Sequence, residues 1–304
     1  MYDICVISKK LIFIWLLFIM LSVFVLLSTP HQPSVLVILY ETDLSNEHLR
    51  TYLDTLQRFN YNYIILTDTQ WKGFGRKVKT IEHYLHTLHP EQIVVISDAR
   101  DVFVCKKANT LYDTYASLAK DKILVSTELA CCEHTRRTRP PNSFRKLDGS
   151  HLPTNEISTD SGAIQKWIDE YKKLADSKYP NKNLKFTNPN AGLYMGKAKH
   201  LLNMYSYMNI KDDKEDDQSV LSEIILQHPH LFVLDYFSAV FSNSFAWNQN
   251  APEIYDGCYY TKDKSARHIQ NLIFKTKPFF LHFPAKHFSC YDKVLEMLNK
   301  TNLV

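Results

Sequence analysis

Three apolar runs separated by two amphipathic segments constrain what this chain can fold into. The runs are VLVILY at residues 35–40, YIILT at 63–67 and IVVI at 93–96. Continuous, β-branched runs of this kind are typical of strands that are buried on both faces, as in parallel sheets. Between them, residues 46–59 and 77–88 carry apolar side chains at helical spacing. The order predicts a doubly wound α/β fold with a mostly parallel central sheet flanked by helices.

The rest of the chain continues this pattern. Spacing predicts helices at residues 112–119, 161–175, 197–207, 217–226 and 291–299, and short apolar runs predict strands at 123–127, 191–195, 231–235 and 279–282. Residues 131–160 are polar and predict a long loop, and such loops are usually functional. We see no internal repeat, which favours one large domain.

An uncharged segment near the N-terminus predicts a membrane anchor. Residues 11–28 read LIFIWLLFIMLSVFVLLS, which as a helix would span about 27 Å, close to the hydrocarbon thickness of a bilayer. Lys9 and Lys10 precede the segment, and the first charges after it are acidic. The positive-inside rule then keeps the N-terminus cytoplasmic. The alternative is a cleaved signal peptide, but no A-x-A site follows the segment.

The anchor fixes an expected layout and compartment. The predicted layout is a cytoplasmic tail at residues 1–10, a transmembrane signal anchor at 11–28, a stem at 29–34 and a catalytic domain at 35–304. This is a single-pass type II protein of the endoplasmic reticulum or Golgi membrane, with its main domain in the lumen. The membrane is therefore one expected partner.

Composition bears on two further classes of function. A net charge of +4, without a basic stripe interleaved with aromatic residues, excludes nucleic acid as an expected partner.

Of the six cysteines, Cys5 precedes the apolar segment and five follow it, so at most two disulfides can form among the five. No C-x-x-C pair occurs, which argues against a zinc knuckle, and spacing does not decide which cysteines pair.

Two carboxylates directly after the third apolar run predict a metal site. Asp98 and Asp101 follow IVVIS, and ligands of open α/β sheets bind beyond the carboxyl ends of the strands. Mg²⁺ and Mn²⁺ prefer oxygen ligands and keep coordination sites for substrate phosphates. The alternative is a surface turn, since aspartate is common after strands.

A histidine at the end of a late strand is the candidate third ligand. His282 ends the run FFLH, and an imidazole there could complete a metal shell with the acidic pair. His287 is a rival five residues on. The alternative is an ordinary core or surface histidine. We expect Asp101 and His282 to converge on a single cation.

Two polar segments hold further candidates. The first, residues 212–217, reads DDKEDD; such a run is normally a solvated face or a helix N-terminus. Asp217 precedes the apolar positions of the helix predicted at 217–226 and would also suit an N-cap role. The second is Asn190 in the sequence NPNAG, whose amide could bind sugar hydroxyls or could simply form a tight turn.

Taken in order, several motifs of the chain resemble the glycosyltransferase domain of the multifunctional procollagen lysyl hydroxylases and, more loosely, the collagen galactosyltransferases. The resemblance covers most of the chain between Tyr63 and His282. Its motifs are Trp71-Lys72-Gly73, the D-x-x-D at Asp98 to Asp101, Ser126-Thr127-Glu128, Asn190-Ala191-Gly192, Asp216-Asp217-Gln218, Leu234-Asp235-Tyr236 with Phe241-Ser242-Asn243, and His282.

The resemblance implies a GT-A fold, Mn²⁺ as cofactor and UDP-glucose or UDP-galactose as donor. The implied metal ligands are Asp98, Asp101 and His282, with Asp98 also nearest the nucleotide ribose. Trp71 would help form the uridine pocket. The sugar and acceptor side would be lined by Glu128, Asn190, Asp216 and Asp217, and a catalytic carboxylate is sought among Glu128, Asp216 and Asp217. The implied acceptor is hydroxylysine or galactosyl-hydroxylysine of collagen.

Two departures from the family leave alternatives open. Leu129-Ala130-Cys131-Cys132 replaces a tryptophan-containing loop on the acceptor side, and His282-Phe283-Pro284-Ala285 lacks two glycines that let backbone approach phosphates. No iron-binding hydroxylase domain follows, so lysyl hydroxylation is not expected. The alternatives are a non-catalytic, glycan-binding relic of such an enzyme and a metal-dependent phosphoester hydrolase.

Overall fold

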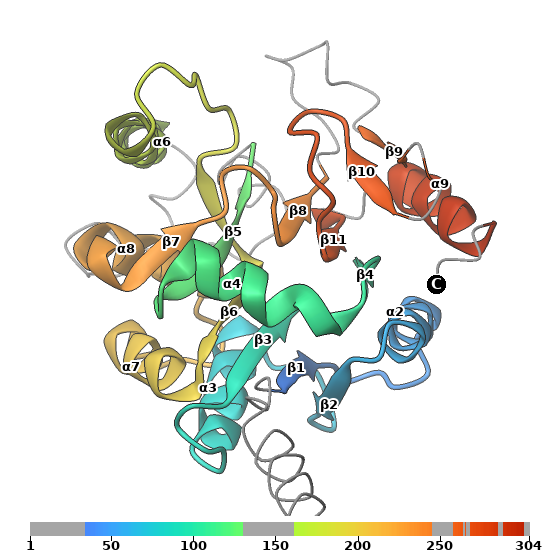
Figure 1. Ribbon diagram of the computed structural model, residues 1–304. Helices are drawn as coiled ribbons and strands as arrows, with labels where there is room; N and C mark the ends of the chain where they lie inside the picture. The colour runs from blue at the N-terminus through green and yellow to red at the C-terminus, as the bar shows by residue number, and fades with distance from the viewer. Residues whose placement is uncertain are drawn as a thin grey trace, which may run out of the picture. The chain divides into compact units, whose positions relative to one another are not determined.

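The computed structural model describes residues 34–129, 161–244, 258–263, 265, 268–284 and 288–300. All described elements belong to one compact unit that begins at Ser34. Its architecture is the predicted one, a mostly parallel central sheet flanked by helices (Figure 1). The predicted tail and the anchor at residues 11–28 lie outside the described residues. In the part of the chain that is described, no helix has the length and apolarity needed to cross a membrane.

Six strands of the described residues form the central sheet in the order β2-β1-β3-β6-β5-β7. Their bounds are β1 Val35–Tyr40, β2 Asn62–Leu66, β3 Ile93–Ser97, β5 Ile123–Glu128, β6 Asn188–Lys197 and β7 Phe232–Leu234. Strands β2, β1 and β3 pair in parallel, as do β5 and β7. Strand β6 runs antiparallel to both of its neighbours, β3 and β5. This reversed strand brings its start, rather than its end, beside the carboxyl end of β3.

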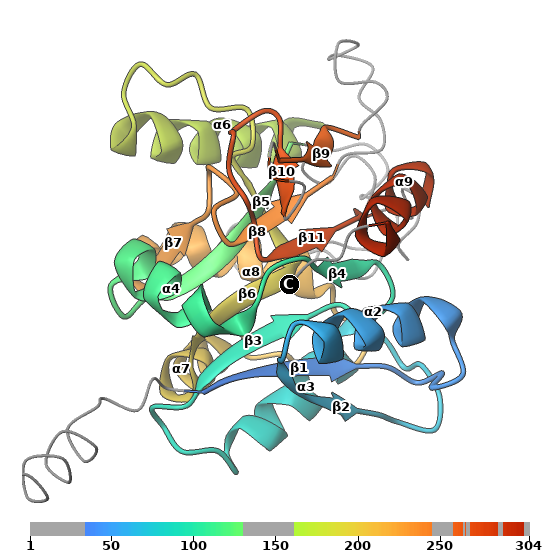
Figure 2. The same ribbon diagram turned by 45° about the vertical axis from the view of Figure 1, so that its right-hand side comes forward.

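Helices cover both faces of this sheet (Figures 1 and 2). Their bounds are α2 Glu47–Arg58, α3 Phe74–Leu85, α4 Leu111–Ala119, α6 Ser161–Lys178, α7 Ala198–Met208, α8 Asp217–Gln227 and α9 Phe288–Asn299, with short 3₁₀ turns η1 at Ala108–Thr110 and η3 at Pro229–Leu231. Apolar residues of α3, α7 and α8 share one buried cluster. Those of α2 and α4 share the cluster on the opposite face. The apolar periodicity of these helices therefore faces the sheet, as expected.

A second, three-stranded sheet lies beside the first and places the candidate site. It has the order β4-β11-β8, with β4 at Val102–Val104, β8 at Phe241–Asn243 and β11 at Phe280–His282. Strand β11 pairs antiparallel with β4, and in this register His282 lies opposite Val102. A separate hairpin joins β9 Tyr260–Lys262 to β10 Ile269–Asn271. The short strands β4, β8, β9 and β10 were not expected from the sequence.

A disulfide joins Cys258, just before β9, to Cys290 in α9. Within the described part of the chain, Cys105 is a free and buried thiol. Cys5, Cys131 and Cys132 lie outside that part. The bridge ties the β9–β10 hairpin to the last helix, where Tyr259 and Tyr291 belong to one apolar cluster.

Removing this bridge should lower stability without touching the site. Without the bridge, Cys258→Ser leaves the unfolded chain free of this loop constraint, and for a sequence separation of 32 residues the loss of stability is about 3.7 kcal/mol. We expect a lower unfolding temperature by calorimetry. Reductant should lower the unfolding temperature of the natural chain by a similar amount and leave the variant unchanged. An identical transition for the natural chain with and without reductant would contradict the bridge.

Candidate metal and nucleotide-sugar site

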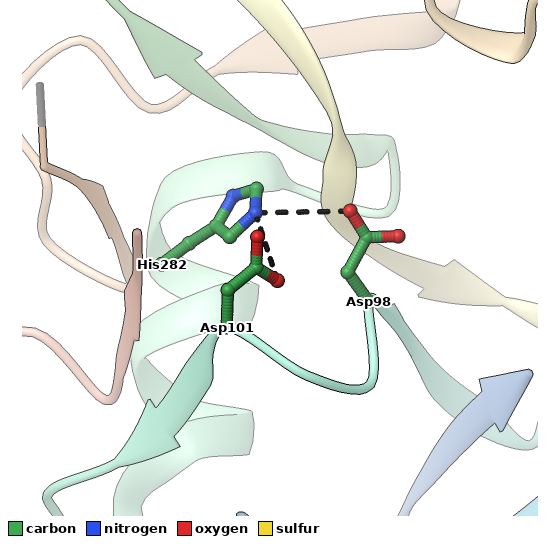
Figure 3. Close-up of side chains that lie close together, drawn as sticks. All are labelled: Asp98, Asp101 and His282. Carbon is green, nitrogen blue, oxygen red and sulfur yellow. Dashed lines mark ion pairs between the residues drawn. The ribbon is translucent and has the colours of Figure 1, made fainter. Parts of the chain in front are cut away.

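Asp98, Asp101 and His282 converge at the edge of the central sheet (Figure 3). The two aspartates lie on the loop from β3 to β4, and His282 ends β11. The nitrogen Nε2 of His282 is 3.7 Å from Oδ2 of Asp98 and 3.5 Å from Oδ1 of Asp101. One ligand atom from each residue lies within 4.8 Å of the others. The convergence expected from the sequence is thus present; that these residues hold a metal stays a prediction.

Backbone pairing on both sides fixes this loop. The N–H of Asp98 donates to the carbonyl of Gly192 at 2.8 Å, which continues the pairing of β3 with β6. The N–H of Phe283 donates to the carbonyl of Asp101 at 2.8 Å, which extends the pairing of β11 with β4. Both aspartates are therefore anchored to strands by their main chains. Their side chains are left to face the site.

The imidazole of His282 is held so that it presents a lone pair to the two carboxylates. Its Nδ1 lies 2.6 Å from Oδ1 of Asn243. The amide of Asn243 is oriented by its Nδ2, which donates to the carbonyl of Thr127 at 2.8 Å. Because Oδ1 can only accept, Nδ1 of His282 is the donor, and the neutral ring carries its lone pair on Nε2. Metal-binding histidines are commonly oriented by such a partner.

The buried atom Nε2 of His282 has no hydrogen-bond partner among the described residues. Its distances to the carboxylates are too long for hydrogen bonds. A hard divalent cation about 2.1 Å from each ligand would hold neighbouring ligand atoms about 3 Å apart. The two separations from Nε2 of His282, 3.7 Å to Asp98 and 3.5 Å to Asp101, are somewhat wider than this. Two carboxylates and an imidazole also form a donor set that suits Mg²⁺ or Mn²⁺, so the residues present fit the expected cation.

The electrostatic environment of His282 supports the same conclusion. Burial lowers its pKa, but the nearby carboxylates of Asp101 and Asp98 outweigh burial, so the pKa lies above the ordinary value. The two carboxylates therefore favour a positive charge at this point. A proton on Nε2 or a divalent cation can each supply it, and the two compete for the same lone pair.

Gly192 keeps the space beside the three side chains open. A Cβ atom built at this position would lie 2.7 Å from Oδ2 of Asp98 and 3.0 Å from Oδ1 of Asn190. It would lie closer still to Cε1 of His282. Any larger residue would push into the ligand atoms, so the absence of a side chain here is a requirement of the site.

Lys77 is a site residue that the sequence analysis missed. It lies in the first turns of α3, is only 5% exposed, and places Nζ 3.1 Å from Oδ1 of Asp98 and 2.5 Å from Oδ2 of Asp217. Burial lowers its pKa, but Asp217 and Asp98 raise the pKa above its ordinary value, so the ammonium is charged. The available signal was a lysine on the apolar stripe of its helix, four residues before Ile81.

The second half of the acidic run, Glu215 to Asp217, is buried, whereas Asp212 and Lys214 are exposed as on a solvated face. Asp216 is fully buried and is the N-cap of α8, accepting hydrogen bonds from the N–H of Ser219 at 3.2 Å and from its Oγ at 2.5 Å. The N-cap role considered for Asp217 therefore belongs to Asp216. Asp217 is the first residue of the helix, and its carboxylate pairs with Lys77.

Glu128 and Asn190 form a hydrogen-bonded group at the ends of β5 and β6. The carboxylate of Glu128, 7% exposed, accepts from Nδ2 of Asn190 at 3.0 Å and from Nε2 of Gln218 at 2.8 Å. Asn190 also accepts from the N–H of Gly192 at 2.8 Å. The group is therefore connected to the metal candidates through Gly192. Its contact with a sugar stays a prediction, as do the catalytic roles of Glu128, Asp216 and Asp217.

Trp71 belongs to an aromatic group at the same edge of the sheet. Its ring is half exposed and packs on Tyr40, which ends β1, and on Phe74. The hydroxyl of Tyr40 donates to Asp68 at 2.9 Å, and Arg76, which pairs with Asp68, lowers the pKa of that carboxyl to about 2. Tyr40 ends β1, and β1 pairs in parallel with β3, which Asp98 and Asp101 follow. Trp71 and the three converging side chains therefore lie at the carboxyl ends of neighbouring strands.

The rival ligand His287 lies outside the described residues.

Comparisons with known proteins identify little. No protein-family model matches the chain, and no curated protein matches it. Among solved structures, the chain is similar to a glycosyltransferase involved in the glycosylation of the major capsid of PBCV-1. That match has a TM-score of 0.41 and 11% sequence identity, and covers 87% of this chain and 100% of the other. At this level of similarity the match assigns no function.

Proposed function

We propose that the chain is a Mn²⁺-dependent glycosyltransferase of the GT-A type that transfers glucose or galactose from a UDP-sugar to a hydroxyl acceptor. The observation that carries this proposal is the convergence of Asp98, Asp101 and the buried Nε2 of His282, which has no hydrogen-bond partner among the described residues. Bound there, the cation would neutralise charge on the departing diphosphate. The order of sequence motifs shared with the collagen-modifying family supports the choice of a UDP-sugar and of a collagen-like hydroxylysine acceptor.

The protein side chains would divide the remaining work. Trp71 offers an exposed ring for the base, at the end of the neighbouring strand. Glu128 fits the sugar side best among the three carboxylates considered for catalysis, because Asp216 caps a helix and Asp217 pairs with Lys77. Two amide donors fix the carboxylate of Glu128, and carboxylate oxygens are acceptors of the kind that bind sugar hydroxyls.

The alternative phosphoester hydrolase is less well supported. Hydrolases of that kind commonly use two cations about 4 Å apart. Across the residues that the structure describes, a single group of three metal-ligating side chains is present.

We further propose that the domain works in the lumen of the endoplasmic reticulum or Golgi, held by the predicted anchor. The bridge between Cys258 and Cys290 supports this location, because disulfides persist mainly in oxidising compartments. The uncharged segment at residues 11–28 and the two lysines before it support a type II orientation.

Thermal unfolding with Mn²⁺ and UDP tests the proposed function. A ligand at 100 times its dissociation constant adds about 2.7 kcal/mol to stability, so we expect a clear rise in unfolding temperature with Mn²⁺ plus UDP and a smaller one with UDP alone. A screen of UDP-sugars should then give Mn²⁺-dependent release of UDP. The absence of any shift would refute the proposal, whereas a shift without turnover on any donor or acceptor would favour the glycan-binding relic.

A further inference from the structure

The two carboxylate oxygens of Asp98 face different partners, because Lys77 pairs with only one of them. Its ammonium is 3.1 Å from Oδ1, whereas Oδ2 faces Nε2 of His282 at 3.7 Å. A carboxylate whose second oxygen is taken by a buried cationic partner cannot rotate freely or chelate through both oxygens. Asp98 is thereby limited to one oxygen as a metal ligand, in one orientation.

Asp217 holds Lys77 in place. The distance between Nζ and Oδ2 of Asp217 is 2.5 Å, and the side chains of Lys77 and Asp217 are 7% and 5% exposed. The pair lies between α3 and α8, where the backbone of α3 is docked on the acidic run. The N–H of Arg76 donates to the carbonyl of Asp213 at 3.0 Å.

Two glycines make this docking possible. Gly73 precedes α3 with φ of 127°, a conformation that side chains rarely allow. A Cβ at Gly75 would lie 3.0 Å from the carbonyl carbon of Asp213 and closer to the carbonyl oxygen of Asp212. The acidic run therefore approaches α3 closely enough for Asp217 to reach Lys77.

We propose that Lys77, anchored by Asp217, is a positioning residue that orients Asp98 for the cation. This deepens the proposed function, since it depends on the metal site. It also gives Asp217 a different role from the catalytic one considered above. The alternative is that Lys77 acts only as a nearby positive charge.

The two roles predict opposite effects on Mn²⁺ affinity. Removing a positive charge near a cation site strengthens cation binding by reducing repulsion. Losing the partner that orients a ligand weakens binding, commonly by about 10- to 100-fold. The sign of the change in Lys77→Met therefore distinguishes positioning from simple electrostatics, without any measurement of turnover.

The test is Mn²⁺ titration of the full chain, followed by the electron paramagnetic resonance signal of free Mn²⁺. We expect Lys77→Met to bind Mn²⁺ about 10-fold or more weakly. The matched control is Lys79→Met, two residues along α3, whose ion pair with Asp213 is partly exposed; its affinity should stay within about twofold of the natural value.

A double variant separates the loss of Mn²⁺ binding from a loss of folding stability. Lys77→Met leaves Asp217 buried without its cation, so we add Lys77→Met with Asp217→Asn, which removes that charge. The double variant should recover most of the unfolding temperature and still bind Mn²⁺ weakly. Equal or tighter binding by either variant would overturn the role of Lys77 while leaving the metal site intact. No Mn²⁺ binding by the natural chain would overturn both proposals.

Discussion

Replacing Asp101 with asparagine should weaken Mn²⁺ binding at least 100-fold, relative to the roughly 10- to 100-fold lost with an orienting partner, and should abolish UDP-sugar turnover. Asp101 supplies one of three ligand groups, 3.5 Å from Nε2 of His282. Loss of a partner that merely orients a ligand costs about 10- to 100-fold in affinity, and loss of a direct anionic ligand should cost at least 100-fold. The change keeps the shape of the side chain, so the measured loss reports on charge and ligation.

The fold should survive this change. The side chain of Asp101 is 21% exposed, and its backbone carbonyl, which accepts from Phe283, is unaffected. We expect the unfolding temperature without Mn²⁺ to stay within a few degrees of the natural value, while the rise produced by Mn²⁺ plus UDP disappears. A variant that still shows that rise would place the cation elsewhere.

The order of elements could be predicted from the sequence because residues that are buried in the core must be apolar, and their spacing differs between strands and helices. The strands β1 and β3 are completely apolar or nearly so, since both faces of the sheet are covered. The helix expected at residues 46–59 differs from the observed α2, Glu47–Arg58, by one residue at each end. The start of α3 was missed by three residues. It begins at Phe74, with Gly73 as its N-cap and no side-chain cap, and the N–H of Arg76 in its first turn donates to the carbonyl of Asp213 in the acidic run.

The short strands could not be predicted, for a physical reason. Strands β4 and β8 are three residues long, and only their partner β11, far away in the sequence, gives them their pairing. Strand β6 was also expected to be shorter than it is. Its first residues, Asn188-Pro189-Asn190, lack apolar side chains of the kind that mark strands, and Asn190 instead hydrogen-bonds with Glu128 and Gly192.

The site was predicted in part. Asp98 and Asp101 follow a strand, and His282 ends one, so their positions along the chain indicated a common edge. The orienting role of Asn243 depends on which atom of its amide faces His282, and no sequence pattern reports that orientation. The ion pairs of Lys77 depend on the docking of α3 against α8. These are contacts between distant segments, and only the three-dimensional arrangement reveals them.

Gly192 connects the fold with the chemistry, because it is both a residue of β6 and one wall of the metal site. Its carbonyl accepts from the N–H of Asp98 and its N–H donates to Asn190. The backbone of β6 thus lies directly against the ligand atoms. A main chain can approach so closely only where no side chain intervenes.

Changing Gly192 to alanine should therefore eliminate the metal site. The new methyl group would lie 2.7 Å from Oδ2 of Asp98 and nearer to the ring of His282, so at least one ligand must turn away. We expect Mn²⁺ affinity to fall at least 100-fold, as for Asp101→Asn, and stability to fall by about 1–3 kcal/mol through overpacking. Mn²⁺ titration and chemical unfolding measure the two effects separately.

Gly196→Ala is the matched control, because the same substitution is made four residues along the same strand. A Cβ at Gly196 would meet Cγ1 of Ile123 at 3.3 Å and other atoms at 3.6 Å, contacts that a small shift of one side chain can relieve. This variant should bind Mn²⁺ as the natural chain does. If both alanine variants lost Mn²⁺ equally, the cause would be a general disturbance of β6. If Gly192→Ala bound Mn²⁺ normally, the cation could not lie among Asp98, Asp101 and His282, because the methyl group would displace Asp98 or His282 from its position.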